Sequence, residues 1–406
     1  MSLVRSHWIP PLALVLGALL NAASWGIVVA YAISPSQGLE LAWIHTLALG
    51  SLTTISLAVL IHVIPGFTDL RWRFERVART LTSILPVLSI GLIASFLVWW
   101  SAGIALFGVL AAATVLLYVA VALVTLSKPL ADPADSAVAR ALAFVLTALG
   151  ATATIGMLLA FGLLDGSAGL LLLAPIHAVL GIVGWLTLLV VGVSVRTFRP
   201  ILGVPSRHRL LHIASSSLLA VGMLATILAV AVDADFVRVG LGLCALGAIA
   251  YVVDSGDRLW RLRIPHWIPP AFIASSLVWM LVAAAAATLG FYRVAVVAAL
   301  SGWLSQMLYA HLHHIGIRVI ATACIGDDDE TRPWELLDAR TSAATFVFAQ
   351  FAVIAMVAAL FMQQGSWLLI AAGLLGAMGS AALGTNVFGA IRRARSIARS
   401  VALSLE

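Results

Sequence analysis

The sequence predicts an all-α, polytopic membrane protein with twelve transmembrane helices, and composition is the first reason. Charged residues make up 10% of the 406-residue chain, against roughly 25% in an ordinary soluble domain. Hydrophobic residues make up 62%, and the mean hydropathy is +1.10. The apolar residues also gather into segments of about 20 residues, which is the length that crosses ~30 Å of hydrocarbon. These observations exclude a soluble fold and place the chain in a lipid bilayer.

The apolar segments follow one another with short loops between them, so we treat the chain as one integral membrane domain, residues 1–406. The first segment is too long for a cleaved signal peptide, and we expect it to be retained as a helix. The predicted spans are 8–33, 40–64, 80–102, 104–126, 139–163, 168–195, 210–232, 236–253, 268–290, 294–320, 342–362 and 366–390.

The basic residues indicate how the chain is oriented in the membrane. Arginines cluster in alternate loops, as after the second span at 71–79 and after the last span at 392–399. Only Arg238 and Arg293 fall on the opposite side, so 21 of the 23 basic residues share one side. Because basic loops stay in the cytoplasm, both termini are predicted to be cytoplasmic in a prokaryotic inner membrane. The net charge of +6 therefore reflects topology and does not indicate nucleic-acid binding.

Besides His212, which stands at the cytoplasmic start of the span 210–232, six of the ten histidines fall inside predicted spans, where an unsatisfied polar group costs several kcal/mol. They lie in every fourth span, the second, sixth and tenth, each of which runs from outside to inside. His45 and His177 lie at a common outer depth. The other four lie toward the cytoplasmic ends: His62, His311, His313 and His314. Ionisable residues at membrane depth are candidates for function, so the sequence predicts an outer histidine pair and an inner histidine cluster.

An internal repeat accounts for this spacing. The motif His7-Trp8-Ile9-Pro10-Pro11 recurs unchanged at 266–270, before the ninth span. A shorter pattern recurs at 50–53, 184–187 and 302–305. It consists of glycine, one variable residue, leucine, and then threonine or serine. Aligning those glycines places His45 within two residues of His177 and makes His62 equivalent to His314. We therefore predict three pseudo-symmetric four-helix units, at about 1–128, 129–263 and 264–406.

The chemistry of the histidines leaves alternatives open. Each imidazole either hydrogen-bonds within the bundle or ligates a metal, for which neutral imidazole is the commonest ligand. Axial ligation of haem suits His45 and His177, since the small residues Ala48 and Gly181 leave room for a macrocycle. At the inner level the ligand types do not decide between haem and copper, because imidazole suits both.

The spans that carry these histidines resemble a known superfamily. The second span, with His45 near its start and His62-Val-Ile-Pro65 at its end, resembles a helix of subunit I of the haem-copper oxidases. The tenth span, with Ala310-His311-Leu312-His313, resembles the oxidase element whose two histidines ligate two haems. The sixth span, with His177-Ala-Val-Leu-Gly181, resembles helices of the NnrS-type proteins, smaller single-chain relatives linked to nitric oxide metabolism.

The resemblance implies twelve helices in three arcs and one or two b-type haems, with copper as the alternative metal. The predicted ligands are His45, His177, His62, His311, His313 and His314. It also implies electron transfer, or the binding and conversion of a diatomic gas such as nitric oxide, by an oxidoreductase. The sixth span lacks the oxidase His-Pro-Glu-Val-Tyr element, so oxygen reduction is not implied. Two other functions remain open: a cofactor-free transporter, and a haem-based sensor or scaffold without turnover.

Overall fold

The structure is a computed structural model that describes residues 11–128, 133–232, 236–263, 266–325, 333–362 and 365–404. The first copy of the repeated motif lies largely outside these residues. The elements are α1 (Pro11–Ile33), α2 (Gln37–His45), η2 (Thr46–Thr53), α3 (Thr54–Thr68), α4 (Glu75–Leu97), α5 (Ser101–Leu126), α6 (Pro133–Asp165), α7 (Ala168–Leu171), α8 (Ala174–Val179), η3 (Leu180–Thr187), α9 (Leu188–Leu202), α10 (Arg209–Val232), α11 (Val237–Trp260), α12 (Ile268–Thr288), α13 (Tyr292–Val297), η5 (Ala298–Leu304), α14 (Ser305–His311), η6 (Leu312–Gly316), α15 (Ile317–Ile325), η7 (Pro333–Leu336), α16 (Ala339–Phe361) and α17 (Ser366–Ser404).

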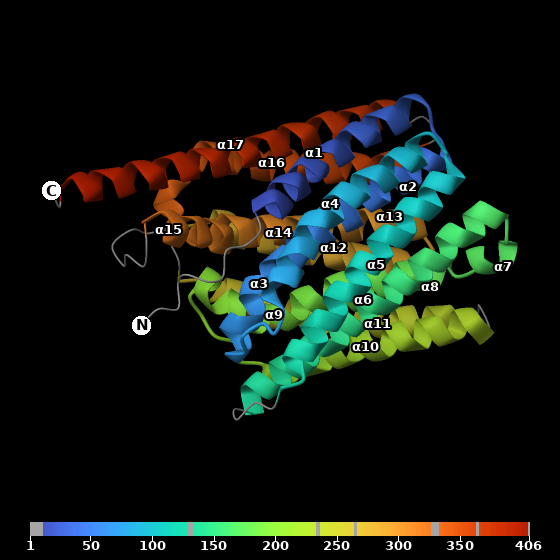
Figure 1. Cartoon of the computed structure of the whole chain (residues 1–406), viewed down its shortest axis with the longest axis horizontal. Coiled ribbons are helices and arrows are strands. Elements are labelled where there is room, and N and C mark those ends of the chain that lie inside the picture. The colour runs from blue at the N-terminus through green and yellow to red at the C-terminus, as the bar shows by residue number, and fades with distance from the viewer. Residues whose placement is uncertain are drawn as a thin grey trace.

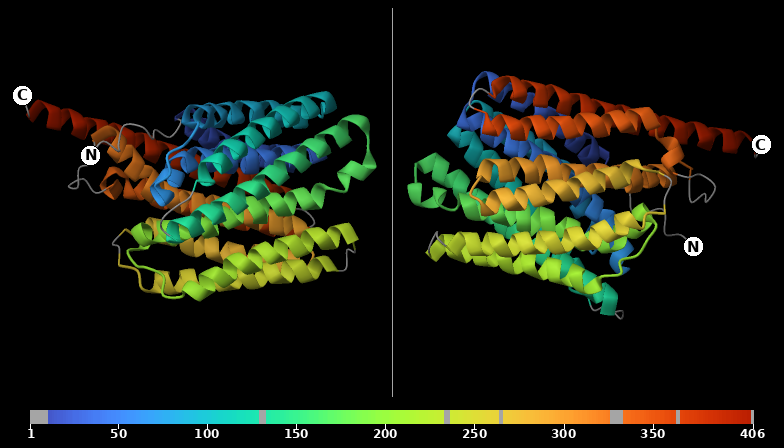
Figure 2. Two further views of the ribbon diagram at one scale, coloured as in Figure 1. Left: turned by 60° about the horizontal axis from the view of Figure 1, so that its bottom comes forward. Right: turned by 180° about the vertical axis from the view of Figure 1, so that it is seen from behind.

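Twelve helices in the described part of the chain are long and apolar enough to cross a membrane, which confirms the predicted all-α polytopic fold. The helices lie side by side along one direction, with α16 and α17 at one edge of the bundle and α10 and α11 at the opposite edge (Figures 1 and 2). The far end of α17 lies at one end of the bundle and α7 at the other. The long apolar helices imply a lipid bilayer around the protein.

The helix ends differ from the limits of the apolar segments. The helix α4 begins at Glu75, where the prediction began at 80, and Arg79 pairs with Glu75 across its first turn. It ends at Leu97, because Trp99 has a φ of 52° and turns the chain toward α5. The helix α17 continues to Ser404 instead of ending near 390. Hydropathy marks where the membrane ends, whereas a helix continues into water when its charged side chains are solvated.

The second and tenth spans form the centre of the bundle. In the most apolar window of each, 72% and 78% of the residues are buried, against 28% in the last span. Trp303 in the tenth span and Trp185 in the sixth are among the largest fully buried side chains. The predicted histidines are therefore carried mainly by helices that are surrounded by other helices.

Four π-helical segments interrupt these three spans. The segment η2 begins directly after His45, η3 begins three residues after His177, and η6 begins directly after His311. The matched glycines fall inside η2, η3 and η5. Short π-helical insertions occur often at functional sites, because they rotate the residues that follow out of regular helical register. The sequence match thus coincides with a shared local distortion beside the histidines.

A repeated contact joins the three spans through these segments. The Trp185 indole N–H donates to Thr53 Oγ1 at 3.0 Å, and the Trp303 indole N–H donates to Thr187 Oγ1 at 3.2 Å. The two tryptophans are equivalent in the glycine alignment, and so are the two threonines. Ser51 stands at the third tryptophan position. Equivalent bonds between successive spans support the predicted rotational repeat, and the three-unit arrangement stays a prediction.

Candidate functional site

The structure brings the predicted outer pair together. His45 is the last residue of α2, and His177 lies in α8, the short helix that leads into η3. Their ring centroids are 6.3 Å apart, and the ring planes differ by 20°. Both side chains are partly buried, so the two imidazoles face each other inside the bundle and not toward lipid.

Each ring of the outer pair is held by one nitrogen. His45 Nδ1 lies 2.8 Å from the Leu41 carbonyl oxygen, and His177 Nδ1 lies 3.0 Å from that of Thr152. A carbonyl only accepts, so each Nδ1 carries the proton and each Nε2 carries a lone pair. No hydrogen bond to either Nε2 is present among the described residues. Metal-ligating histidines typically show this arrangement, in which a backbone carbonyl fixes the tautomer and the ring orientation.

The separation of the rings is also informative. A ligating imidazole nitrogen lies about 2 Å from a metal ion, so two imidazoles on one ion have ring centres about 6 Å apart. The observed 6.3 Å between His45 and His177 agrees with that value. The spacing of the two stacked rings would therefore suit two imidazole ligands of one metal ion, such as the iron of a b-type haem.

The surroundings of the pair are apolar and closely packed. The Phe96 ring lies 4.9 Å from that of His45. A Cβ on Gly156 would lie 2.9 Å from His177 Cε1, so only glycine at that position leaves the imidazole in place. A Cβ on Gly181, the glycine that the sequence suggested, would instead contact the Thr152 side chain at 3.4 Å. Gly156 is thus the small residue that accommodates His177. It lies on α6, whereas His177 lies on α8.

The inner histidines of the tenth span point to different neighbours. His311 Nδ1 donates to the Met307 carbonyl, and His311 Nε2 accepts from the Thr197 hydroxyl at 3.0 Å. His313 Nδ1 donates to the Tyr309 carbonyl at 2.8 Å, and its ring lies 5.4 Å from that of Phe272. At about 100° per residue, side chains two positions apart leave a helix on different faces, and these two faces contact α9 and α12 respectively.

The structure does not bring all the predicted inner ligands to one point. Within the described residues, no group of three or more His, Cys, Asp or Glu side chains is placed to hold a metal ion. His62 is exposed in α3, whereas His314 is buried in η6. His313 is 1% exposed, and its Nε2 has no partner among the described residues. Among the described residues, His313 Nε2 therefore keeps a free lone pair.

Sequence reasoning missed a second inner imidazole, His266. It precedes α12, and burial lowers the pKa of its ring, which favours the neutral form. Its Nε2 also lacks a partner in the described part of the chain. It is close enough to His313 and His314 to interact with both electrostatically. The repeated five-residue motif was the available signal, because His266 is its first residue.

A buried ion pair was missed as well. Asp254 and Arg258 in α11 are 0% and 1% exposed, and the Arg258 Nη2 group donates to Asp254 Oδ2 at 2.8 Å. The Ser206 hydroxyl donates to Asp254 Oδ1 at 2.6 Å, and His212 Nδ1 lies 3.9 Å from the same carboxylate. The predicted span at 236–253 ended one residue before Asp254. The signal available in the sequence was a charged residue, Asp254, directly after an apolar segment.

Comparison with known proteins does not assign the chain to a family. No protein-family model matches the chain, and no curated protein matches it. The function is therefore argued from the geometry of the residues described above.

Proposed function

We propose that this chain is an integral membrane protein of a prokaryotic inner membrane that binds b-type haem between His45 and His177. Its function would be electron transfer, or the binding and conversion of a diatomic gas such as nitric oxide, as in the haem-copper oxidase and NnrS-type proteins that it resembles. The observation that carries the proposal is the outer pair, with ring centroids 6.3 Å apart and both Nδ1 atoms bonded to backbone carbonyls.

The chain contributes ligands, orientation and exclusion of water. When bound, haem supplies one-electron chemistry at iron, and an open axial position adds the binding of a gas. His45 and His177 would both ligate the haem iron, which would favour electron transfer over gas binding at the outer site. The Leu41 and Thr152 carbonyls hold the two rings in the ligating tautomer. A Cβ on Gly156 would displace His177, so this glycine preserves the separation of the pair.

Gas chemistry needs a second site with an open position, and the inner histidines are the candidates. His313 is the strongest of them, because its Nε2 is buried and unpartnered whereas that of His311 accepts from Thr197. His62 and His314 complete the proposed inner set, and His266 lies close to His313 and His314. The inner metal would be a second haem or copper, since imidazole suits either.

An absorption spectrum of the purified protein tests the proposal. The protein should be prepared in mild detergent from haem-supplemented cells, and the spectrum recorded before and after reduction with dithionite. We expect a Soret band and sharpened α and β bands on reduction, with a pyridine haemochrome of the b type. Metal analysis of the same sample would separate a second haem from copper at the inner site.

The same measurement separates the alternatives. A folded, monodisperse protein with no haem bands would contradict the proposal and favour a cofactor-free transporter. A haem protein that is neither reduced by an electron donor nor altered by nitric oxide would favour a sensor or scaffold. Bands that shift on adding nitric oxide would indicate an open axial position, which the outer pair alone does not offer.

The proposed orientation has a test of its own. Twelve spans return the chain to the side where it started, and the arginine distribution predicts that this side is the cytoplasm. A reporter active only in the cytoplasm should give signal when fused after residue 406, and none when inserted at 166–167 between α6 and α7. A reporter active only outside should show the reverse. Equal signals at the two positions would contradict the topology.

A further inference from the structure

The helix α17 continues past its apolar segment and carries a cluster of arginines there. Its predicted span ends at residue 390, whereas the helix continues to Ser404 and projects beyond the other helices of the bundle (Figure 1). Four arginines with exposed side chains follow the span: Arg392, Arg393, Arg395 and Arg399. The first two stand about 3–5 Å along the helix axis from residue 390. This is the depth of the phospholipid head groups beside the hydrocarbon core.

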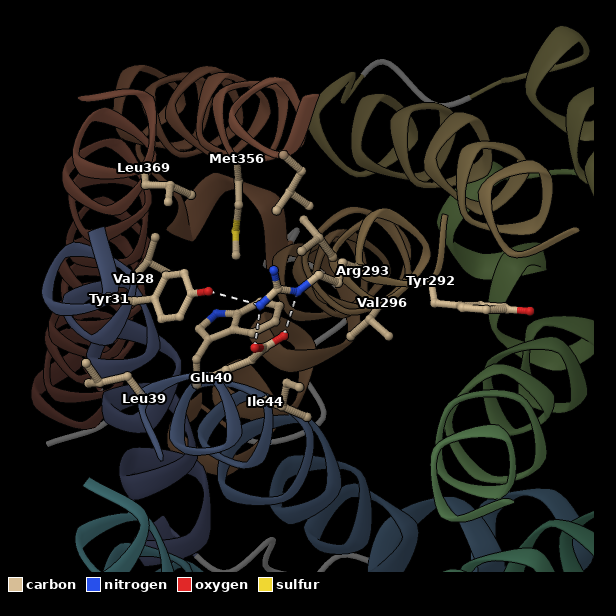
Figure 3. Close-up of a pocket in the computed structure, with 13 residues that line it drawn as sticks. Val28, Tyr31, Leu39, Glu40, Ile44, Tyr292, Arg293, Val296, Met356 and Leu369 are labelled. Carbon is tan, nitrogen blue, oxygen red and sulfur yellow. Dashed lines mark hydrogen bonds and ion pairs between the residues drawn. The ribbon is translucent and has the colours of Figure 1, made fainter. Parts of the chain in front are cut away.

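Two exposed arginines elsewhere in the protein have carboxylate partners. Arg293 Nε donates to Glu40 Oε1 at 3.0 Å, and its Nη2 donates to the Tyr31 hydroxyl at 3.0 Å, so that these three side chains point toward one another (Figure 3). Arg196 pairs with Asp135 at 2.8 Å.

The arginines of α17 differ from these. Arg392, Arg395 and Arg399 make no hydrogen bond or ion pair with any of the described residues. Their positions differ by three and four residues, so the three side chains lie on one face of the helix. That face therefore carries positive charge with no partner within the described part of the chain.

Two of the arginines line a hollow in the surface of α17. Its lining is Gly389, Arg392, Arg393 and Ser396, and its volume is about 410 Å³, many times the ~30 Å³ of one water molecule. Arg393 is held in place, because its Nε and Nη2 groups donate to the Leu336 carbonyl at 2.9 and 2.6 Å. This leaves further N–H donors of Arg393, the whole Arg392 guanidinium and the Ser396 hydroxyl available to a ligand.

The net charge of the hollow favours an anion. Arg393 lies close enough to Asp338 to interact with its carboxylate electrostatically. That carboxylate caps α16, where its Oδ1 accepts from the Thr341 backbone N–H and hydroxyl. Asp338 offsets at most one positive charge, so Arg392 remains uncompensated. Arginine binds phosphate through two parallel N–H donors, which makes a phosphate group the best-matched anion.

The same face of α17 is apolar within the membrane span. Leu374, Met378 and Phe388 are 56%, 49% and 63% exposed. The spacings from 374 to 378, from 388 to 392 and from 392 to 396 are each four residues, and 378 to 388 is a sum of threes and fours. One face of an edge helix thus changes from lipid-exposed apolar side chains to arginines. A free phosphate would use only the hollow, whereas a phospholipid matches the whole face.

We propose that this hollow binds the phosphate of an anionic phospholipid, whose acyl chains lie along the apolar part of the same face of α17. Arg392 and Arg393 supply paired N–H donors, and Ser396 donates its hydroxyl. The bound phosphate neutralises arginines that would otherwise repel one another on the helix. The inference does not rest on haem between His45 and His177.

Titration of the delipidated, detergent-purified full chain with phosphatidylglycerol, labelled with a fluorophore on one acyl chain, tests this inference. We expect saturable binding that weakens with added salt and is tighter than that of phosphatidylcholine with the same label, which has no net charge. Arg392→Gln leaves the Arg393 bond to Leu336 intact and should weaken phosphatidylglycerol binding about fivefold. Adding Arg393→Gln should bring the loss to about 30-fold, at about 1 kcal/mol for each arginine.

Arg209→Gln is the matched control. It removes the same charge from an exposed arginine at the start of α10, at the opposite edge of the bundle, and should bind like the wild type. The apparent Tm of each variant shows whether it is folded.

The outcomes separate this site from the other possibilities. Equal affinity for the two lipids would overturn the proposal, and so would an equal loss in Arg209→Gln, which would indicate surface charge in general. Displacement of the labelled lipid by an equal concentration of inorganic phosphate would overturn it in favour of a site for free phosphate. If the arginines instead pair with the acidic residues at 327–330, the wild type would not prefer phosphatidylglycerol, and the proposal would be wrong.

Discussion

Replacing His45 or His177 with alanine should remove the outer haem or convert it to a five-coordinate form, since each variant deletes one proposed axial ligand. Haem affinity should fall by more than about tenfold, because even the loss of a residue that only orients a ligand costs about 10- to 100-fold. Haem content and reduced-minus-oxidised spectra, measured on matched amounts of detergent-purified protein, would report the change.

Two comparisons make this result specific to ligation. His208→Ala removes a histidine whose side chain is 45% exposed, and it should leave the spectrum unchanged. His177→Gly opens space for a ligand from solution, so added imidazole should restore a six-coordinate spectrum to that variant. If both alanine variants keep wild-type haem content and band positions, the ligand assignment is wrong. The two histidines would then be hydrogen-bonding groups of the bundle.

The transmembrane helices and the outer pair could be predicted from the sequence. Hydropathy identifies spans because lipid tolerates few charges, and the spans in turn give each histidine a depth. His45 and His177 were paired by depth and by the glycine alignment, and the structure places their rings 6.3 Å apart. Depth does not give direction around a helix axis. Depth grouped His311 with His313 at one level, whereas their spacing along the helix separates their directions, and the two side chains contact α9 and α12 respectively.

The features that the sequence did not reveal depend on tertiary packing. The acceptor for His177 Nδ1 is the Thr152 carbonyl, which lies 25 residues away on another helix. The role of Gly156 follows from the same contact between helices. Hydropathy also does not separate a π-helical turn from an α-helical one, because both are equally apolar. Gly50, Gly184 and Gly302 marked the repeat, but only the structure shows a π-helical segment at each.

Removing one member of the Asp254–Arg258 pair should destabilise the protein more than any surface change. Asp254→Leu would leave the Arg258 guanidinium, 1% exposed, without its carboxylate. Breaking a buried ion pair in this way costs about 3–5 kcal/mol, because the remaining charge stays desolvated. The apparent Tm and the yield of monodisperse protein in detergent should both fall sharply.

The double variant Asp254→Leu with Arg258→Met decides whether charge desolvation is the cause. Replacing a whole buried pair by apolar side chains is often neutral or stabilising, so Tm should return close to that of the wild type. Asp257→Leu is the matched control, since Asp257 pairs with Arg261 at the same spacing on α11 but remains solvent-accessible. It should change Tm little, because solvent screens such pairs. If the double variant is as unstable as Asp254→Leu, the Ser206 hydroxyl and His212 beside the carboxylate hold α10 and α11 together, and the ion pair is incidental.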